Sequence, residues 1–381
     1  LGDVDLQVDA TLADTISGAG LFQMFDPLPE RLDSLHDALH VLEDAGRAHS
    51  AATAKVLVLL AMELSWTDDW KERRDLLEQA VALAHSVGDR SALESALRAT
   101  LWCLLVPQCW DLRQEAMTRL IELESTSTRR HRDPSAATIL ARTQQAFGDL
   151  GGAASTLAAV TRADLADDPE MTWAMVCSTF GVDVSAGRLV RAEAVLPRIC
   201  ETPDAALGDH TYGREHTSIL TLRTMRGDLR YFADRRDEMA TMFDLIPAFR
   251  PVVASALADV GRMDEARELI DWYDEQKLAA IAPDMLWTMS MTFIARAAST
   301  VGNTAVCTDV YERLLPYAEQ TVSVAPSVFG VVHHHLADVS VTTGHLERAG
   351  RHLHAARRLH VARGFEGWSA EDAYLGLRTP S

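Results

Sequence analysis

The sequence predicts an all-α protein, built as a solenoid of seven or eight stacked helical hairpins. Strand patterns are nearly absent, with few alternating runs of Val, Ile and Thr and no Asn-Gly turn. A glycine recurs between amphipathic helical stretches at intervals of about 40 residues, which is typical of two-helix repeats. At 381 residues the chain exceeds one ordinary core. A repeat array avoids that limit, because each unit packs only on its neighbours.

The recurring glycines predict where one helix ends and the next begins, because glycine adopts the left-handed conformation that ends helices. They are Gly88, Gly148, Gly187, Gly227, Gly261, Gly302 and Gly344. The first separation, 60 residues, is long enough for a further joint without glycine. Five positions after most of these glycines stands a small residue: Ala153, Ala192, Ala266, Cys307 or Ala349. A small side chain there allows close packing of the second helix. Gly88 and Gly227 depart from the pattern, with Leu93 and Phe232.

These joints place the predicted hairpins along residues 31–381, after a partly irregular N-terminal segment, 1–30. The predicted hairpins span 32–65, 71–105, 111–147, 151–186, 189–226, 229–260, 263–300 and 303–343, and a last helix spans 346–363. Loops are expected near 125–134 and 202–210, where polar and turn-forming residues gather.

Composition narrows the functional class. The net charge of −19 argues against nucleic-acid binding, and the dense basic run Arg129–Arg132 is interpreted as a solvated loop. Five dispersed cysteines indicate reduced, buried thiols in a cytoplasm. No run of about 18 apolar residues predicts a membrane span. The start at Leu1, without a signal peptide, is what an excised segment of a larger protein would have.

Several stretches resemble the tetratricopeptide-like C-terminal region of actinobacterial signalling ATPases of the STAND type, in regulators associated with LuxR-type DNA-binding or nucleotide cyclase domains. The matching stretches are Glu72–Arg74, Glu78–Ala84 with Gly88-Asp89, Gly261–Leu269, and Val310–Ala318 followed by Gly330, Gly344, His352, Gly364 and Trp368. The similarity covers about residues 30–378. It implies a right-handed TPR-like α-solenoid that serves as the sensing or interaction arm of a regulator. The phosphate-binding pattern Gly-x4-Gly-Lys-Ser/Thr is absent, so the resemblance brings no ATPase to this segment.

Histidines are the strongest candidates for metal ligands, and packing is the favoured interpretation for them. Seven gather between His333 and His360. Adjacent helical residues point about 100° apart, so His333, His334 and His335 cannot converge on one ion. A metal site or a pH-responsive patch in this cluster stays an open alternative. His36 and His40 have the i, i+4 spacing of zinc helices but no evident third ligand, which favours simple decoration of an amphipathic helix.

Two further patterns each have a structural interpretation beside a functional one. The run Asp68–Glu72 superficially matches the metal-diphosphate motif of terpene cyclases, but an acid cluster at a helix N-terminus explains it better. Trp102, Trp173 and Trp287 are each placed in the first helix of a hairpin, the helix that lines the concave face of related solenoids. Together with His334 they are candidate groove residues, and buried packing is the favoured alternative for any one tryptophan.

These patterns predict a protein that is not an enzyme: a regulatory sensor or interaction solenoid, without cofactor or metal, binding a protein domain, peptide or small effector in its concave groove. A structural scaffold that drives assembly, including homo-oligomerisation, is the alternative. A metal-dependent all-α enzyme is a remote third. The sequence does not identify the ligand, the oligomeric state or the flanking domains.

Overall fold

The protein is all-helical apart from one short β-hairpin, within the residues that the computed structural model describes. Those residues are 28–65, 67, 69–126, 133–165, 168–201, 212–241, 243–244, 246–324 and 326–369. Contacts divide the chain into two compact units, Leu1–Thr143 with Pro283–Met285, and Gln144–Ala282 with Leu286–Ser381. None of the helices in the described parts is long and apolar enough to cross a membrane.

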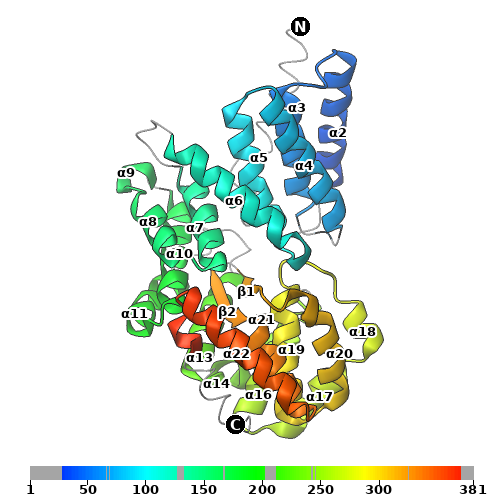
Figure 1. The fold of residues 1–381 in the computed structure, drawn as a ribbon, viewed down its shortest axis with the longest axis vertical. Helices are drawn as coiled ribbons and strands as arrows, with labels where there is room; N and C mark the ends of the chain where they lie inside the picture. The colour runs from blue at the N-terminus through cyan, green and yellow to red at the C-terminus, as the bar shows by residue number, and fades with distance from the viewer. Residues whose placement is uncertain are drawn as a thin grey trace. The chain divides into compact units, whose positions relative to one another are not determined.

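The first unit consists of antiparallel helix pairs (Figure 1). Its helices are α2 (Pro29–Asp44), α3 (Ala51–Glu63), α4 (Trp70–Ser86), α5 (Arg90–Cys103), α6 (Trp110–Ser125) and α7 (Pro134–Phe147), which continues into the second unit. A side-chain oxygen caps the start of three of them and satisfies a free N–H: Ser50 before α3, Asp69 before α4 and Asp89 before α5. Most of α3 is buried, which explains why its sequence is apolar nearly all round.

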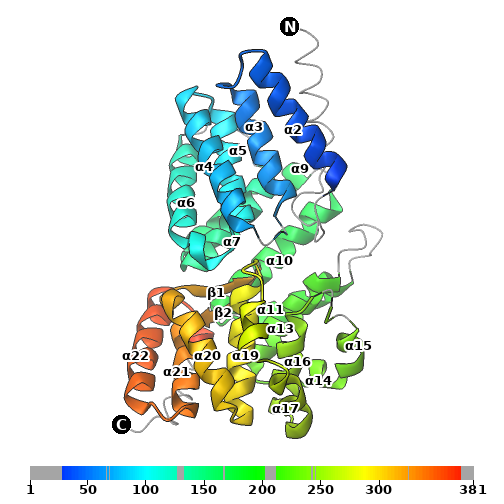
Figure 2. The same ribbon diagram turned by 90° about the vertical axis from the view of Figure 1, so that its right-hand side faces the viewer.

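The second unit continues with shorter, more numerous helices (Figure 2). They are α8 (Leu150–Ala158), α9 (Arg162–Leu165), α10 (Pro169–Ser185), α11 (Leu189–Cys200), α13 (Tyr212–Arg226), α14 (Arg230–Asp234), α15 (Arg236–Ala240), α16 (Phe249–Asp259), α17 (Met263–Asp271), α18 (Glu275–Ala279), α19 (Trp287–Val301), α20 (Thr304–Leu314), α21 (Val332–Thr342) and α22 (Leu346–Ala362). Between α20 and α21 lie the antiparallel strands β1 (Thr321–Val324) and β2 (Ser327–Val331).

The glycine joints are confirmed. All seven predicted glycines have a positive φ, between 63° and 88°, which a side chain other than that of glycine rarely adopts. The five small residues that follow them, Ala153, Ala192, Ala266, Cys307 and Ala349, are all 0% exposed. The joint without glycine lies between α5 and α6, where Leu104–Cys109 includes Pro107 in a 3₁₀ turn. The joints between these helices were therefore readable from local sequence.

The β-hairpin corrects the expectation of a purely helical pair over 303–343. Thr321, Val322, Ser327, Val328, Phe329 and Val331 are each at most 3% exposed. Strand β2 contacts α10, α13, α21 and α22, and β1 contacts α19. Four of these helices, α10, α13, α19 and α21, each come first in a helix pair that a glycine joins. The hairpin therefore fills the face that these first helices form.

The second unit also contacts itself from end to beginning. A Cβ on Gly148, at the start of the unit, would lie 2.3 Å from Cγ of Arg363, just after α22. Leu150 packs near Gly364, and Gly187 lies against Glu366 and Gly367. The unit is thus a closed ring of helices around the hairpin, whereas the ends of a simple repeat array would stay apart.

Candidate functional site

The first unit contains an open groove of about 270 Å³ formed by α4, α5 and α6. The buried residues Leu97 and Thr100 of α5 form its floor, and α4 and α6 line its sides. From α4 come Leu77, Glu78, Val81, Ala82 and His85, and from α6 come Leu112, Glu115, Ala116 and Arg119. The lining positions recur at helical spacing, so each helix presents one continuous face to the groove.

The interior of this groove is apolar. Val81 and Leu112 are half-buried and Ala82 is exposed, so apolar surface is open to a ligand. The hydroxyl of Thr100 donates to the carbonyl of Ala96 at 2.9 Å, which leaves its methyl group as the part available to the floor. A site with this lining favours an apolar side chain, because burial there removes apolar area from water.

Charged side chains stand around the apolar floor. Arg119 forms an ion pair with Glu115 at 3.8 Å along α6. Glu78 is exposed on α4, and His85 is exposed in the last turn of the same helix. The carboxylate of Glu78 favours a ligand with a basic group beside its apolar side chain.

A buried arginine holds the helices of this groove together. Arg73 of α4 is 1% exposed, and its Nε donates to the carbonyl of Cys103 at 3.1 Å. Its Nη1 donates to the carbonyl of Leu64 at 3.0 Å and to that of Thr67. These carbonyls lie at or just after the ends of α5 and α3, where backbone acceptors lack helical partners and the helix dipole is negative. One guanidinium therefore joins three helices.

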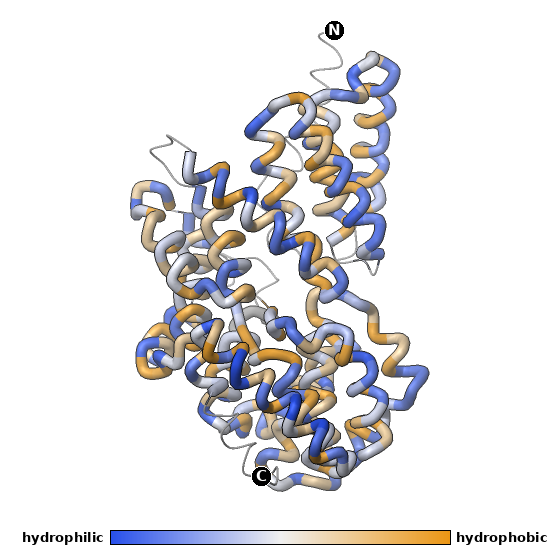
Figure 3. The backbone as a smooth tube through the Cα atoms, viewed as in Figure 1, coloured by the Kyte–Doolittle hydropathy of each residue, from blue (hydrophilic) through white to orange (hydrophobic). Residues whose placement is uncertain are grey.

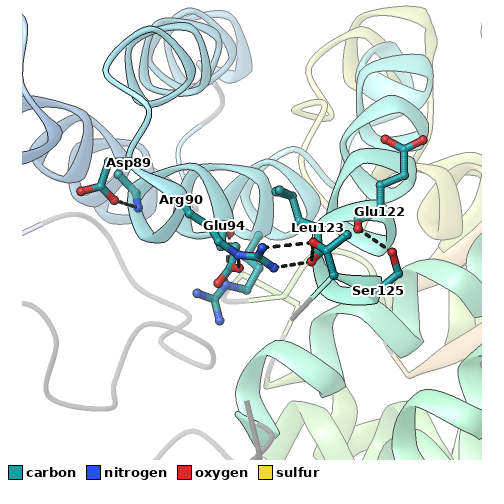
Figure 4. Close-up of polar contacts among 9 residues, drawn as sticks. Asp89, Arg90, Glu94, Glu122, Leu123 and Ser125 are labelled. Atoms are coloured by element: carbon teal, nitrogen blue, oxygen red, sulfur yellow. Dashed lines mark hydrogen bonds and ion pairs between the residues drawn. The ribbon is translucent and has the colours of Figure 1, made fainter. Parts of the chain in front are cut away.

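Two further arginines act in the same way. Arg113 of α6 is buried and donates from Nε to the carbonyl of Leu101 at 3.3 Å, and burial lowers its pKa to about 10. Arg90 of α5 donates to the carbonyl of Leu123 near the end of α6, and to Glu94 at 2.8 Å (Figure 4). The groove thus has walls fixed by hydrogen bonds at the helix ends, in addition to apolar packing.

The three predicted groove tryptophans do not meet in one site. Trp102, Trp173 and Trp287 are 8%, 4% and 8% exposed and lie in α5, α10 and α19. The indole N–H of Trp173 donates to the carbonyl of Ile199 at 3.0 Å, and Trp287 packs edge-on against Tyr317. Trp102 lies in the second helix of the pair α4/α5, so its predicted place in a first helix is wrong. Burial of all three agrees with the packing alternative, and contact with a ligand stays a prediction.

Histidines in the second unit bind the outer edge of strand β2. Nε2 of His335 donates to the carbonyl of Phe329 at 2.9 Å, and the N–H of Val331 donates to Nε2 of His360 at 3.0 Å. These two bonds assign opposite tautomers to the two imidazoles. His334 lies with its ring against Trp368, at 5.3 Å between ring centroids. The predicted groove residue His334 is therefore half-buried and lies near strand β2, because Trp368 also lies against Gly330.

A second group of histidines forms a directed chain of hydrogen bonds. Tyr311 Oη lies 3.0 Å from Nε2 of His352, whose Nδ1 lies 2.7 Å from Nδ1 of His333. Nε2 of His333 is 3.4 Å from the carboxylate of Glu319. Because a carboxylate only accepts, His333 donates to Glu319, His352 to His333, and Tyr311 to His352. Every member is satisfied with both imidazoles neutral.

Burial keeps these imidazoles neutral. Desolvation lowers the pKa of His335 to about 3. Desolvation, then the charges of His333, Arg348 and Arg351, lower the pKa of His352 to about 4. Desolvation also lowers the pKa of His333, although Glu319 opposes the shift. His333, His335 and His352 are therefore uncharged hydrogen-bonding groups at neutral pH.

No group of three His, Cys, Asp or Glu residues in the described parts of the chain has the arrangement of a metal site. The three adjacent histidines face different partners, as their helical spacing predicted. His36 and His40 are exposed on α2. Asp69 caps α4 by accepting from the N–H of Glu72 at 3.0 Å, as the helix-start interpretation predicted. Asp68 and the run Arg129–Arg132 lie outside the described residues.

The cysteines are free thiols, as predicted, with one exception to their burial. Cys103, Cys109, Cys177 and Cys307 are buried, whereas Cys200 at the end of α11 is exposed. Burial raises the pKa of the Cys103, Cys109 and Cys307 thiols to about 11, which makes these thiols poor nucleophiles.

Sequence reasoning missed the groove of the first unit. The signal was present as an apolar stripe at helical spacing, Leu77 and Val81 on α4 and Leu112 and Ala116 on α6. Such a stripe equally indicates a core face, and only the spacing between neighbouring helices separates the two cases. Comparison with protein-family models and with curated proteins finds no match.

Proposed function

We propose that the chain is the interaction and sensing arm of a larger signalling regulator, and that the groove of α4, α5 and α6 binds a segment of a partner. The ligand class is an apolar side chain with a basic group beside it, presented by a helical or extended peptide. Binding would act through different affinities for two states of the regulator. The chain itself performs no catalysis in this proposal.

The groove carries the proposal because it combines three features of recognition sites. Its floor is apolar, its rim carries Glu78, and its helices are joined through Arg73 and Arg113. A pre-formed site loses less conformational entropy on binding than a flexible one. The repeat pattern and the resemblance to signalling ATPases support the regulatory context.

The test is to fill the groove with a large side chain. Ala82 is exposed, so Ala82→Trp should preserve folding while blocking the floor. The probe is a fluorescent amphipathic peptide of leucine and lysine. We expect its affinity for the variant to fall by at least about tenfold, the equivalent of about 1.4 kcal/mol.

Ala154→Trp, at an exposed position of α8, is the matched control and should retain the affinity of the unchanged protein. Glu78→Gln should weaken binding less than Ala82→Trp, because an exposed charge contributes less than the apolar contact. Equal binding by the Ala82→Trp and Ala154→Trp variants, or no binding by any form, would overturn the proposal.

A structural scaffold is the second candidate, and the closed ring of the second unit favours it. Its interior is filled by β1 and β2, so this unit offers a rigid body with no room for a ligand at the hairpin. Such a body would hold neighbouring domains at a set spacing. Light scattering separates the two roles: a scaffold that assembles copies forms an oligomer without any peptide present.

A further inference from the structure

The last long helix, α22, has an outer face whose charge opposes that of the whole chain. Leu346–Ala362 carries four arginines and one carboxylate, Glu347, in a protein of net charge −19. Figure 3 shows hydrophilic residues along this helix in the second unit. Helix geometry places Arg351, His354, Arg357 and Arg358 within one arc of its surface, and all four are exposed.

The inner face of the same helix packs against the rest of the second unit. Arg348 donates from Nε to the hydroxyl of Ser340 at 3.1 Å and lies over the ring of Tyr311 at 3.8 Å. His352 belongs to the chain with His333. By contrast, Arg358 is 61% exposed and lies 3.4 Å from Glu319. A helix dipole accounts for cations in the last turn but not for Arg351 at mid-helix.

Apolar residues lie on the same arc. Leu346 is 42% exposed and Val361 is 74% exposed. They are separated by about 22 Å at 1.5 Å per residue. Gly350 lies between them on the surface, and a Cβ there would meet nothing within 4 Å. Glycine weakens a helix interior by about 1 kcal/mol relative to alanine. Internal packing does not require it here, whereas close approach of another backbone would.

We propose that this face, Leu346 to Val361, docks an acidic amphipathic helix of a protein partner. Carboxylates of the partner would pair with Arg351, Arg357 and Arg358, and its apolar side chains would cover Leu346, Gly350 and Val361. Apolar contacts at both ends favour a protein over a phosphate polyanion, because a phosphate backbone uses cations alone. This surface is separate from the groove of the first unit.

Fluorescence anisotropy on the full chain tests this assignment. The probe is a labelled helical peptide of about 20 residues with glutamates on one face and leucines on the other. We expect Arg351→Glu, Arg357→Glu and Arg358→Glu together to weaken binding by about 10- to 100-fold. Binding by the unchanged protein should weaken as salt rises from about 50 mM to about 300 mM, because these charges are exposed.

The matched control reverses three cations elsewhere, Lys71→Glu, Arg230→Glu and Arg267→Glu, and should retain full affinity for the acidic peptide. Ala82→Trp should also retain it, so failure of the groove proposal and failure of this one are distinguishable. Val361→Glu gives a second reading without reversing any arginine, and should weaken binding several-fold.

Three results would overturn the assignment. One is equal loss in the control triple variant, which would indicate non-specific charge attraction. The second is binding of a single-stranded oligonucleotide of matched charge, but not the peptide, in an arginine-dependent way. The third is arginine-dependent dimerisation of the chain alone at low salt, which would make a second copy the occupant.

Discussion

Both units are built from helix pairs, but apolar surface stays open in one unit and is covered in the other. In the first unit an apolar groove between α4, α5 and α6 stays open, and buried arginines at the helix ends hold its walls. In the second unit a β-hairpin fills the face formed by α10, α13, α19 and α21, and neutral side chains bind its backbone. The first unit therefore leaves apolar surface open, and the second unit covers it.

The type of buried polar side chain in each unit depends on the backbone groups with which it forms hydrogen bonds. The ends of α3 and α5 present carbonyls in a negative dipole field, which a guanidinium such as that of Arg73 matches. A strand edge presents both donors and acceptors. Neutral histidine can supply either, as His335 and His360 do for Phe329 and Val331.

The tip of the hairpin is held by a residue far away in the sequence. Nε2 of Gln145 donates to the carbonyl of Pro326 at 3.1 Å and lies 2.8 Å from the hydroxyl of Ser185. A Cβ on Gly181 would lie 2.0 Å from the same carbonyl, so glycine makes this approach possible. The hairpin therefore connects the first helices of the ring with the last.

The largest loss of stability is expected from removing a large buried side chain at the centre of the second unit. Phe329 is 1% exposed and packs edge-on against Phe293. Phe329→Ala should lower the free energy of unfolding by about 3–5 kcal/mol, since it leaves a cavity. Urea denaturation measures the loss, and hydrogen exchange should localise it to α19 and α21. Ser323→Ala, at the half-buried position of β1, should cost at most about 0.5 kcal/mol. Equal acceleration of exchange in α3 would contradict a loss confined to the second unit.

A loss of about 3 kcal/mol is expected from Arg73→Met in the first unit. Methionine has a similar length, but the carbonyls of Leu64, Thr67 and Cys103 would lose a buried donor. Thermal or urea unfolding measures the loss. The neighbouring substitution Arg74→Met is the control, because Arg74 forms a surface ion pair with exposed Asp75. If both variants unfold alike, the helix-end role of Arg73 is wrong.

A smaller loss of stability, which depends on pH, is expected in the second unit and not in the first. Folding lowers the pKa of His335 from its ordinary 6.5 to about 3 and that of His352 to about 4. Below pH 6.5 the unfolded chain binds protons that the folded chain does not, so stability falls as pH falls toward those folded values. We expect a loss of about 2 kcal/mol from His335 alone between pH 7 and pH 5.

The first unit is the comparison for this pH effect. Its described histidines are all exposed: His36, His40, His49 and His85. Hydrogen exchange at the two pH values should therefore show the second unit loosening first. His335→Gln keeps an N–H donor for Phe329 and should reduce the pH dependence. A stability that is the same at pH 7 and pH 5 would contradict neutral burial of these rings.

The sequence predicted the helix joints well because their signals are local. A left-handed glycine such as Gly261 and a small residue such as Ala266 act within one turn and its neighbouring helix. The hairpin 321–331 escaped prediction because both of its faces are buried. A strand buried on both sides lacks the apolar–polar alternation that identifies strands, and a short run of this kind also fits a buried helix.

The candidate sites divide in the same way. The three tryptophans are buried, which agrees with the packing alternative, and their contact with a ligand stays a prediction. Helical geometry predicted that the three adjacent histidines point in different directions, and their partners, Glu319, the edge of β2 and Trp368, come from elsewhere in the fold. The groove and the outer face of α22 depend on which stripes neighbours cover, and one helix in isolation cannot indicate that.

By itself, the sequence determined an all-helical chain, the places where its helices end, and an acidic composition with an oppositely charged last helix. These are properties of single residues and of spacing along one element. Tertiary structure alone decided that the second unit closes on itself, that a hairpin fills it, and that the first unit keeps an open groove. Closure of the second unit depends on contacts between residues far apart in the chain, such as Gly148 and Arg363. No local sequence pattern indicates which distant residues will meet.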